Sequence, residues 1–120
     1  MKFLSLSLFV LFLLPCSSPQ APGVHSMDSE SFKTAINKNK VNLIDVRTPG
    51  EFSNGTIDYA VNIDYKGENF LEGFSKYNKK EALYIFCRSG GRSSKASQVL
   101  SEAGFKEIYD LDGGYMGWNK

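Results

Sequence analysis

Residues 81–104 read EALYIFCRSGGRSSKASQVLSEAG, and this stretch decides the fold. The apolar run at residues 82–86 is rich in residues that favour β-structure and is typical of a strand covered on both faces of a parallel sheet. Gly90 and Gly91 break that run. From Arg92 onward, apolar residues recur at helical spacing up to Gly104, which stands where a C-terminal glycine cap belongs. The pattern predicts a strand, a tight polar loop and a helix, with Cys87 at the carboxyl end of the strand, facing the amino end of the helix.

The position of Cys87 predicts a reactive thiol. The first amides of a helix are unpaired and carry partial positive charge, and the amides of a glycine-rich turn can form a nest that binds an anion. Arg88 and Arg92 add two permanent positive charges to the same small volume. A thiol in that setting loses its proton more easily than a free cysteine, and the thiolate is the nucleophile. The alternative is a small buried cysteine that ends a strand, and the two arginines and two glycines favour the reactive thiol.

Three segments resemble the single-domain rhodaneses, which are sulfurtransferases. Residues 87–93 look like the active-site loop of that family, residues 43–52 resemble its D-V-R-x-x-x-E-F segment, and residues 111–118 resemble its closing L-x-G-G-x-x-x-W. Together the three motifs cover the chain from about Val24 to the end, in the family's order and spacing. The resemblance implies a rhodanese-like α/β fold, with a parallel sheet of about five strands and helices on both faces.

The resemblance also implies a reaction. The Cys87 thiolate would take the sulfane sulfur of thiosulfate or a similar donor, and a thiophilic acceptor would then remove this sulfur from the Cys87 persulfide. The expected partners are therefore a small anionic sulfur donor and a thiol or protein acceptor, and no metal or organic cofactor is expected. The residues expected to bind the substrate form the loop after the cysteine: Arg88, Ser89, Gly90, Gly91, Arg92 and Ser93.

Two other function classes are weighed against this one. The active-site loops of phosphatases and arsenate reductases resemble the motif C-x5-R, whereas Cys87 and Arg92 have the spacing C-x4-R. The shorter loop makes a smaller binding site, which suits a single sulfur atom. A binding module on the same fold could carry sulfur or dock a partner without turnover, although an inactive copy would be expected to have lost the cysteine. The shorter loop and the retained Cys87 favour the sulfurtransferase.

The composition limits the range of functions further. A chain of 120 residues has room for one domain, and its 14 basic and 13 acidic residues leave it almost neutral. Nucleic-acid binding would call for a concentrated basic face, so nucleic acid is not expected as a partner. Cys16 and Cys87 cannot form a metal cluster on their own, and the one histidine, His25, is not expected to act as a base beside Cys87.

The amino-terminal residues predict export. Residues 1–16 combine a short positive start with an apolar run that is too short to span a membrane comfortably, so they are interpreted as a signal peptide. Residues 17–23 are expected to be a flexible tether and residues 24–120 the folded domain. Cys16 follows a sequence reminiscent of a bacterial lipobox, except that Pro15 replaces a small residue. A periplasmic soluble protein and a membrane-tethered lipoprotein both remain open, and the membrane is a partner only through the signal or a lipid on Cys16.

The remaining segments predict alternating helices and strands. The expected strands are residues 41–46, 60–63, 82–86 and 105–111. The expected helices begin after Ser26 or Asp28, at Pro49, near Phe70, at Arg92 and after Gly114.

Asp45 and Arg47 end a strand on the same side of the sheet as Cys87, so a supporting role near the site is considered for both. An ion pair between Arg47 and Glu51 that pins the following turn is the favoured interpretation. The family usually carries a histidine where Thr56 stands, but sulfur transfer does not need an imidazole at that place.

Overall fold

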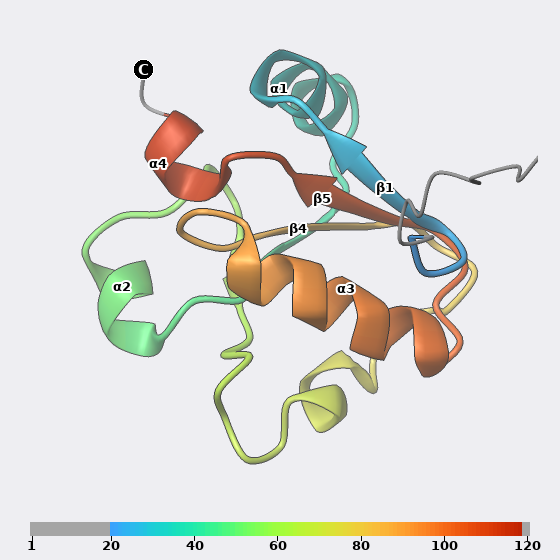
Figure 1. Cartoon of the computed structure of the whole chain (residues 1–120). Coiled ribbons are helices and arrows are strands. Elements are labelled where there is room, and N and C mark those ends of the chain that lie inside the picture. Colours follow the sequence, from blue (N-terminus) through green and yellow to red (C-terminus); the bar gives the residue numbers. More distant parts are fainter. Residues whose placement is uncertain (1–19, 119–120) are drawn as a thin grey trace, which may run out of the picture.

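The computed structural model describes residues 20–118, which form one parallel sheet with helices packed on both faces (Figure 1). The five strands of this part of the chain are β1 (Val24–Met27), β2 (Asn42–Asp45), β3 (Val61–Asn62), β4 (Leu83–Phe86) and β5 (Ile108–Leu111). The helices are α1 (Ser29–Lys38), α2 (Pro49–Ser53), the single-turn 3₁₀ helix η1 (Leu71–Phe74), α3 (Gly91–Glu102) and α4 (Gly114–Trp118). The strand order β1-β5-β4-β2-β3 puts β4, the strand that leads into Cys87, at the centre.

The side chains of β4 alternate between two apolar layers, which explains its continuous apolar sequence. Leu83 and Ile85 pack under α3 and η1, in a cluster that includes Leu100. Phe86 packs on the opposite face, in a cluster that includes Phe32 of α1. Trp118 of α4 completes this second layer with an edge-to-face contact to Phe32, at 6.0 Å between ring centroids. The sheet is therefore covered on both faces, as the sequence predicted.

Local signals fix several helix ends. The Asp28 carboxylate accepts a hydrogen bond from the Ser31 amide at 2.7 Å and caps α1. Thr48 and Glu51 form a capping box at the start of α2. Gly104 follows α3 with a φ of +104°, a backbone conformation that a glycine adopts without strain. The caps at Asp28 and Gly104 confirm the prediction, and the capping box at Thr48 adds to it.

Three segments differ from the prediction. Val24–Met27 forms the edge strand β1, which the sequence did not predict because His25 and Ser26 are exposed and give the strand little apolar alternation. Only Leu71–Phe74 is helical in the segment after Phe70, and only as a 3₁₀ turn. The last strand begins at Ile108 rather than residue 105, since the Phe105 amide donates to Leu100 O and closes the end of α3.

Within residues 20–118, no helix is long and apolar enough to cross a membrane. The expected signal peptide and Cys16 lie outside the described residues.

Candidate active site

The candidate nucleophile lies at the junction between the central strand and α3. Cys87 directly follows β4, and residues 88–90 turn the chain into α3. Gly90 has a φ of +114°, and its amide donates a hydrogen bond to Cys87 Sγ at 3.1 Å. A non-glycine residue at this φ would be strained, so glycine lets the loop aim an amide at the sulfur.

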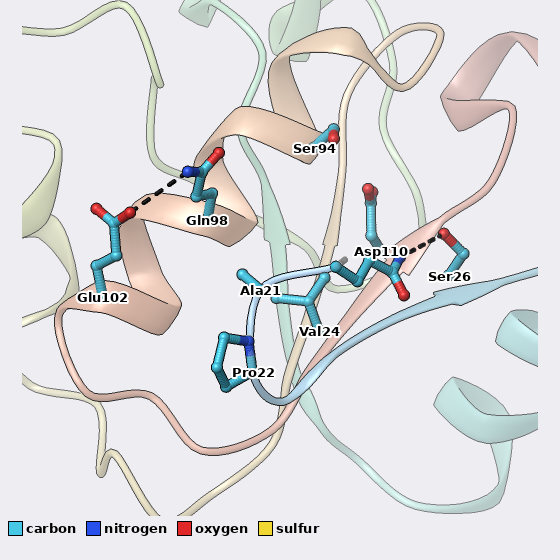
Figure 2. A pocket seen from close by; sticks show the side chains of 9 residues that line it. Ala21, Pro22, Val24, Ser26, Ser94, Gln98, Glu102 and Asp110 are labelled. Atoms are coloured by element: carbon cyan, nitrogen blue, oxygen red, sulfur yellow. Dashed lines mark hydrogen bonds between the residues drawn. The ribbon is translucent and has the colours of Figure 1, made fainter. Parts of the chain in front are cut away.

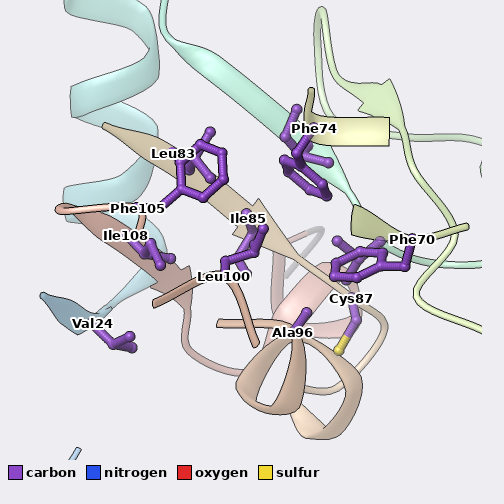
Figure 3. Close-up of a cluster of buried hydrophobic side chains, with 12 residues drawn as sticks. Val24, Phe70, Phe74, Leu83, Ile85, Cys87, Ala96, Leu100, Phe105 and Ile108 are labelled. Carbon is purple, nitrogen blue, oxygen red and sulfur yellow. The ribbon is translucent and has the colours of Figure 1, made fainter. Parts of the chain in front are cut away.

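Cys87 is also part of the apolar core, with an exposed fraction of 1 %. Figure 3 shows its side chain beside Phe70 and Ala96, with the sulfur atom directed toward α3. The two alternatives weighed from the sequence are therefore combined in one residue: Cβ packs with the core, while Sγ faces the polar loop. A small donor must enter beside a buried sulfur, which suits transfer of a single atom better than binding of a bulky group.

The environment lowers the pKa of the Cys87 thiol. Burial opposes ionisation and raises this pKa, but hydrogen bonds from Ser93, from the Gly90 amide and from the Ser89 amide outweigh burial and lower it. Ser93 lies in the first turn of α3, is fully buried, and places its Oγ 3.4 Å from Cys87 Sγ. In the thiol form the sulfur donates to Ser93 Oγ, and in the thiolate form the rotatable hydroxyl can donate to the sulfur instead. The site therefore makes ionisation to the nucleophilic thiolate easier than it is for a free cysteine.

The closing Gly-Gly segment holds the cysteine loop from the other side. The Tyr115 amide donates to Cys87 O at 2.8 Å, and the Met116 amide donates to Arg88 O at 2.9 Å. Gly114 has a φ of +58°, and a Cβ at this position would lie 2.5 Å from Arg88 O. The start of α4 can therefore approach the loop only with glycine at position 114, which gives a physical reason for the second glycine of the motif.

Arg92 is held by an ion pair that the sequence did not predict. Its NH1 and NH2 groups donate to the two oxygens of Glu51, at 2.6 and 2.9 Å. This pairing lowers the pKa of Glu51 to about 2. The guanidinium thus links α3 to α2, and much of its charge is already compensated before any substrate binds.

The prediction of an ion pair between Arg47 and Glu51 is wrong. Arg47 instead pairs with Asp45, at 2.7 Å between NH2 and Oδ2, and both side chains are buried. The Arg47 amide and Nε also donate to Asp45 Oδ1, so the short segment after β2 folds back on itself. Glu51 cannot take this place, because the capping box orients it toward Thr48 and α3.

The Asp45–Arg47 pair supports the fold rather than reaching the sulfur. Thr56 Oγ1 donates to Asp45 Oδ2 at 2.9 Å, so a hydroxyl stabilises this carboxylate where the family usually has a histidine. The Arg47 guanidinium lies 4.3 Å from the centroid of the Tyr115 ring. Since the Tyr115 amide binds Cys87 O and the Arg47 guanidinium also lies 5.9 Å from the centroid of the Phe86 ring, the pair reaches the site through these two neighbours of Cys87.

Arg88 is the cation of the loop that remains available. Both Arg88 and Ser89 are exposed. Among the described residues, the side chain of Arg88 makes neither a hydrogen bond nor an ion pair, whereas those of Arg47 and Arg92 are both paired. His25 is remote from the loop: it lies on edge strand β1, stacks on Tyr109, and is separated from β4 by β5. Within the described residues, the loop therefore offers backbone amides, the Ser93 hydroxyl at the sulfur and the unpaired guanidinium of Arg88.

The sequence predicts each residue of the loop. It does not predict that Glu51 pairs with Arg92, or that the Tyr115 and Met116 amides donate to the loop. Complementary charge was the only available signal for Glu51. The amide donors have no side-chain signal, because backbone groups make these contacts.

Comparisons with known proteins agree with this geometry. The chain is 36% identical over 114 residues to thiosulfate sulfurtransferase 18 of Arabidopsis thaliana, covering 85% of this chain and 83% of the relative. It is 37% identical over 99 residues to a tRNA uridine(34) hydroxylase of Acinetobacter baumannii, covering 77% of this chain and 31% of the relative. The crystal structure of a rhodanese-like domain protein from Staphylococcus aureus superposes with a TM-score of 0.69 at 29% identity, covering 78% of this chain and 89% of the other.

The family model and the relatives together support the sulfurtransferase class. The model described as "Rhodanese-like domain" matches residues 28–120, which include all three motifs found in the sequence. With its five-stranded parallel sheet and its cysteine loop after the central strand, this chain belongs to the rhodanese-like domain family.

Proposed function

We propose that the protein is a sulfurtransferase that carries the transferred sulfur as a persulfide on Cys87. The observation that carries the proposal is the hydrogen bonding of Cys87 Sγ. This sulfur accepts a hydrogen bond from the Gly90 amide at 3.1 Å and lies 3.4 Å from the Ser93 hydroxyl oxygen. These groups lower the pKa of the thiol despite its burial. They lie beside the sulfur atom to which the outer persulfide sulfur would be bonded.

The reaction divides into two displacements at sulfur. The Cys87 thiolate attacks the outer sulfur of thiosulfate, a sulfur–sulfur bond forms to Cys87, and the bond within the donor breaks as sulfite leaves with the electron pair. A thiolate acceptor, or cyanide in an assay, then attacks the outer sulfur, and Cys87 leaves as a thiolate. Neither step needs an external oxidant or reductant, so the donor thiosulfate and the acceptor are the only reactants required.

The loop divides the work of binding between its residues. Exposed Arg88 is suited to attract the anionic donor, because its guanidinium is unpaired among the described residues and can form paired hydrogen bonds with an oxyanion. Arg92 keeps the first turn of α3 in place through Glu51. Ser93 and the loop amides stabilise charge on sulfur.

The phosphatase alternative is disfavoured by the same contacts. A phosphatase of the C-x5-R type needs a guanidinium free to bind the phosphoryl oxygens, whereas Arg92 already binds Glu51 with both terminal nitrogens. A carrier without turnover is distinguished from an enzyme by experiment. The likeness to a tRNA hydroxylase shows that this domain also occurs in proteins named for other reactions.

The test is the intact mass of the protein before and after incubation with thiosulfate, followed by a thiosulfate:cyanide assay. We expect a gain of one sulfur atom, reversed by cyanide, and repeated turnover in the assay. Cys87→Ser should keep the fold and lose both the added mass and the activity. Single loading without turnover would instead identify a carrier, and activity in Cys87→Ser would rule out the mechanism.

We also propose that the protein is exported through residues 1–16 and acts outside the cytoplasm, either soluble in the periplasm or tethered by a lipid on Cys16. The support is the pattern of a short basic start, an apolar run and a cysteine. Cell fractionation tests export. Fatty-acid labelling of the wild type and of Cys16→Ala separates the tethered form from the soluble one. Full-length protein in the cytoplasm would contradict the proposal.

A further inference from the structure

A buried carboxylate lies under α3 at a place where the apolar layer would normally continue. Asp110 on β5 follows Ile108 at a spacing of two residues, so both side chains face the α3 side of the sheet. Only 8 % of Asp110 is exposed, and its Oδ1 is buried without a hydrogen-bond partner among residues 20–118. A buried polar group without a partner costs free energy, and a charged one costs more. The fold alone therefore gives no reason for an aspartate here.

No cation in the described part of the chain neutralises Asp110. The two ion pairs of residues 20–118 are Arg47–Asp45 and Arg92–Glu51, and neither involves Asp110. Burial raises the pKa of Asp110 to about 6, and the nearby charge of Asp112 adds to this, while a hydrogen bond with Ser93 opposes it. The group is therefore largely ionised at neutral pH and lacks a counter-ion.

Asp110 lines a cavity of about 820 Å³ between α3, β5 and the segment before β1. Figure 2 shows its carboxyl group pointing from β5 toward Ser94 on α3. The polar lining also includes Glu102 and Gln98, which are hydrogen-bonded to each other. The ionisable groups among the residues that line the cavity are therefore both acidic.

The side of the cavity that is formed by β1 and the segment before it is partly apolar and is anchored. It consists of Ala21, Pro22 and Val24, together with Gln20 and Ser26, which are hydrogen-bonded to each other. The Ser101 hydroxyl donates to Pro22 O at 2.6 Å, and the Val24 amide donates to Ala21 O at 3.1 Å, so this segment is tied to α3 and to itself. The cavity thus combines a carboxylate, a second carboxylate at its edge and a partly apolar wall, the arrangement that suits a cationic head on a short apolar stem.

We propose that this cavity is a second binding site, for a protonated nitrogen of an amine or guanidine that pairs with Asp110. The ligand would satisfy the buried carboxylate with charge-assisted hydrogen bonds, and its stem would lie against Ala21, Pro22 and Val24. The cavity lining does not include Cys87, so the site is distinct from the cysteine loop, and Ser93, which interacts with Asp110 and contacts Cys87, lies between the two. The same chemistry could come from a small free amine or from a lysine or arginine side chain of another protein.

The test is a titration of the full chain with small probes. Binding is monitored through the amide signals of Ser94, Gln98 and Glu102 in nuclear magnetic resonance spectra. The probes are butylamine and butylguanidine, with butan-1-ol as a neutral probe of similar shape. We expect saturable shifts at these residues with both cations and none with the alcohol. A blocked Gly-Arg-Gly peptide distinguishes the sources: saturation by the peptide at lower concentration than by butylguanidine indicates a protein side chain, and the reverse order indicates a small ligand.

Asp110→Asn should weaken binding by about tenfold or more, because it removes the charge and keeps the shape. Asp112→Asn is the matched control, since Asp112 carries the same charge in the next turn but does not line the cavity, and it should change the affinity by less than about threefold. Equal binding by Asp110→Asn and the wild type, or the absence of saturable shifts with either cation, would overturn the proposal.

Discussion

Arg92 and Glu51 are 41 positions apart in the sequence and join α3 to α2 through two hydrogen bonds of 2.6 and 2.9 Å. This pair changes what the second arginine of the cysteine loop is expected to do. From the sequence alone, Arg88 and Arg92 are both expected to bind the donor. Because its guanidinium is already paired with Glu51, we propose that Arg92 mainly positions the loop and that exposed Arg88 attracts the anion.

The first prediction separates these two roles. Arg92→Ala should lower kcat/KM for thiosulfate by about fivefold or more, because it loosens the loop and leaves the Glu51 charge unpaired near an anionic substrate. The double variant Arg92→Ala/Glu51→Gln should recover part of that loss, since the repelling charge is gone. Arg88→Ala should raise KM with a smaller effect on kcat. Steady-state kinetics of the wild type and the three variants measure these effects. A double variant with a kcat/KM no higher than that of Arg92→Ala would contradict the charge argument.

The second prediction concerns Gly114. Gly114→Ala should destabilise the protein by about 2 kcal/mol or more, since it combines a strained φ with a backbone clash against Arg88 O. It should also reduce sulfur transfer, because the same approach holds the cysteine loop. Gly117→Ala is the matched control in the same helix: a Cβ there meets nothing within 4 Å, so the change should be neutral or slightly stabilising. Urea denaturation and activity measured together would show whether the two glycines differ as expected.

The third prediction concerns Ser93. Ser93→Ala should raise the pKa of Cys87, because the thiolate loses a hydrogen-bond donor inside a buried site. The pH dependence of alkylation by iodoacetamide measures this pKa. Ser94→Ala changes the neighbouring exposed hydroxyl, which is not among the groups that lower the Cys87 pKa, and should leave the profile in place. Identical profiles for Ser93→Ala and the wild type would remove Ser93 from the site.

The fourth prediction follows from the raised pKa of Asp110, which shifts from 3.8 to about 6 on folding. Between these values the folded protein binds more protons than the unfolded chain, so the free energy of unfolding falls as the pH rises from about 4 to about 6. At pH 8 Asp110→Asn should therefore be more stable than the wild type, by at most about 3 kcal/mol. The difference should shrink toward zero near pH 4. Urea denaturation at both pH values checks this, and a variant less stable than the wild type at pH 8 would contradict it.

Much of the fold follows from residues that lie close together in the sequence. The apolar run before Cys87 required a strand buried on both faces, and Gly104 marked the end of the helix that follows. The capping residues Asp28 and Thr48 started their helices where a side-chain oxygen can reach an amide three positions on. Such signals are readable from sequence because strand periodicity and helix capping act between near neighbours.

Only the tertiary structure decided which charges meet. Arg47, Glu51 and Arg92 allow several pairings in the sequence, and the fold brings Arg92 to Glu51 and leaves Arg47 to Asp45. The same holds for Asp110, whose burial depends on α3 crossing β5. The energy of an ion pair or a buried charge depends on distance and solvent exposure, and packing sets both. The strand, loop and helix around Cys87, in contrast, could be predicted from residues that are neighbours in the sequence.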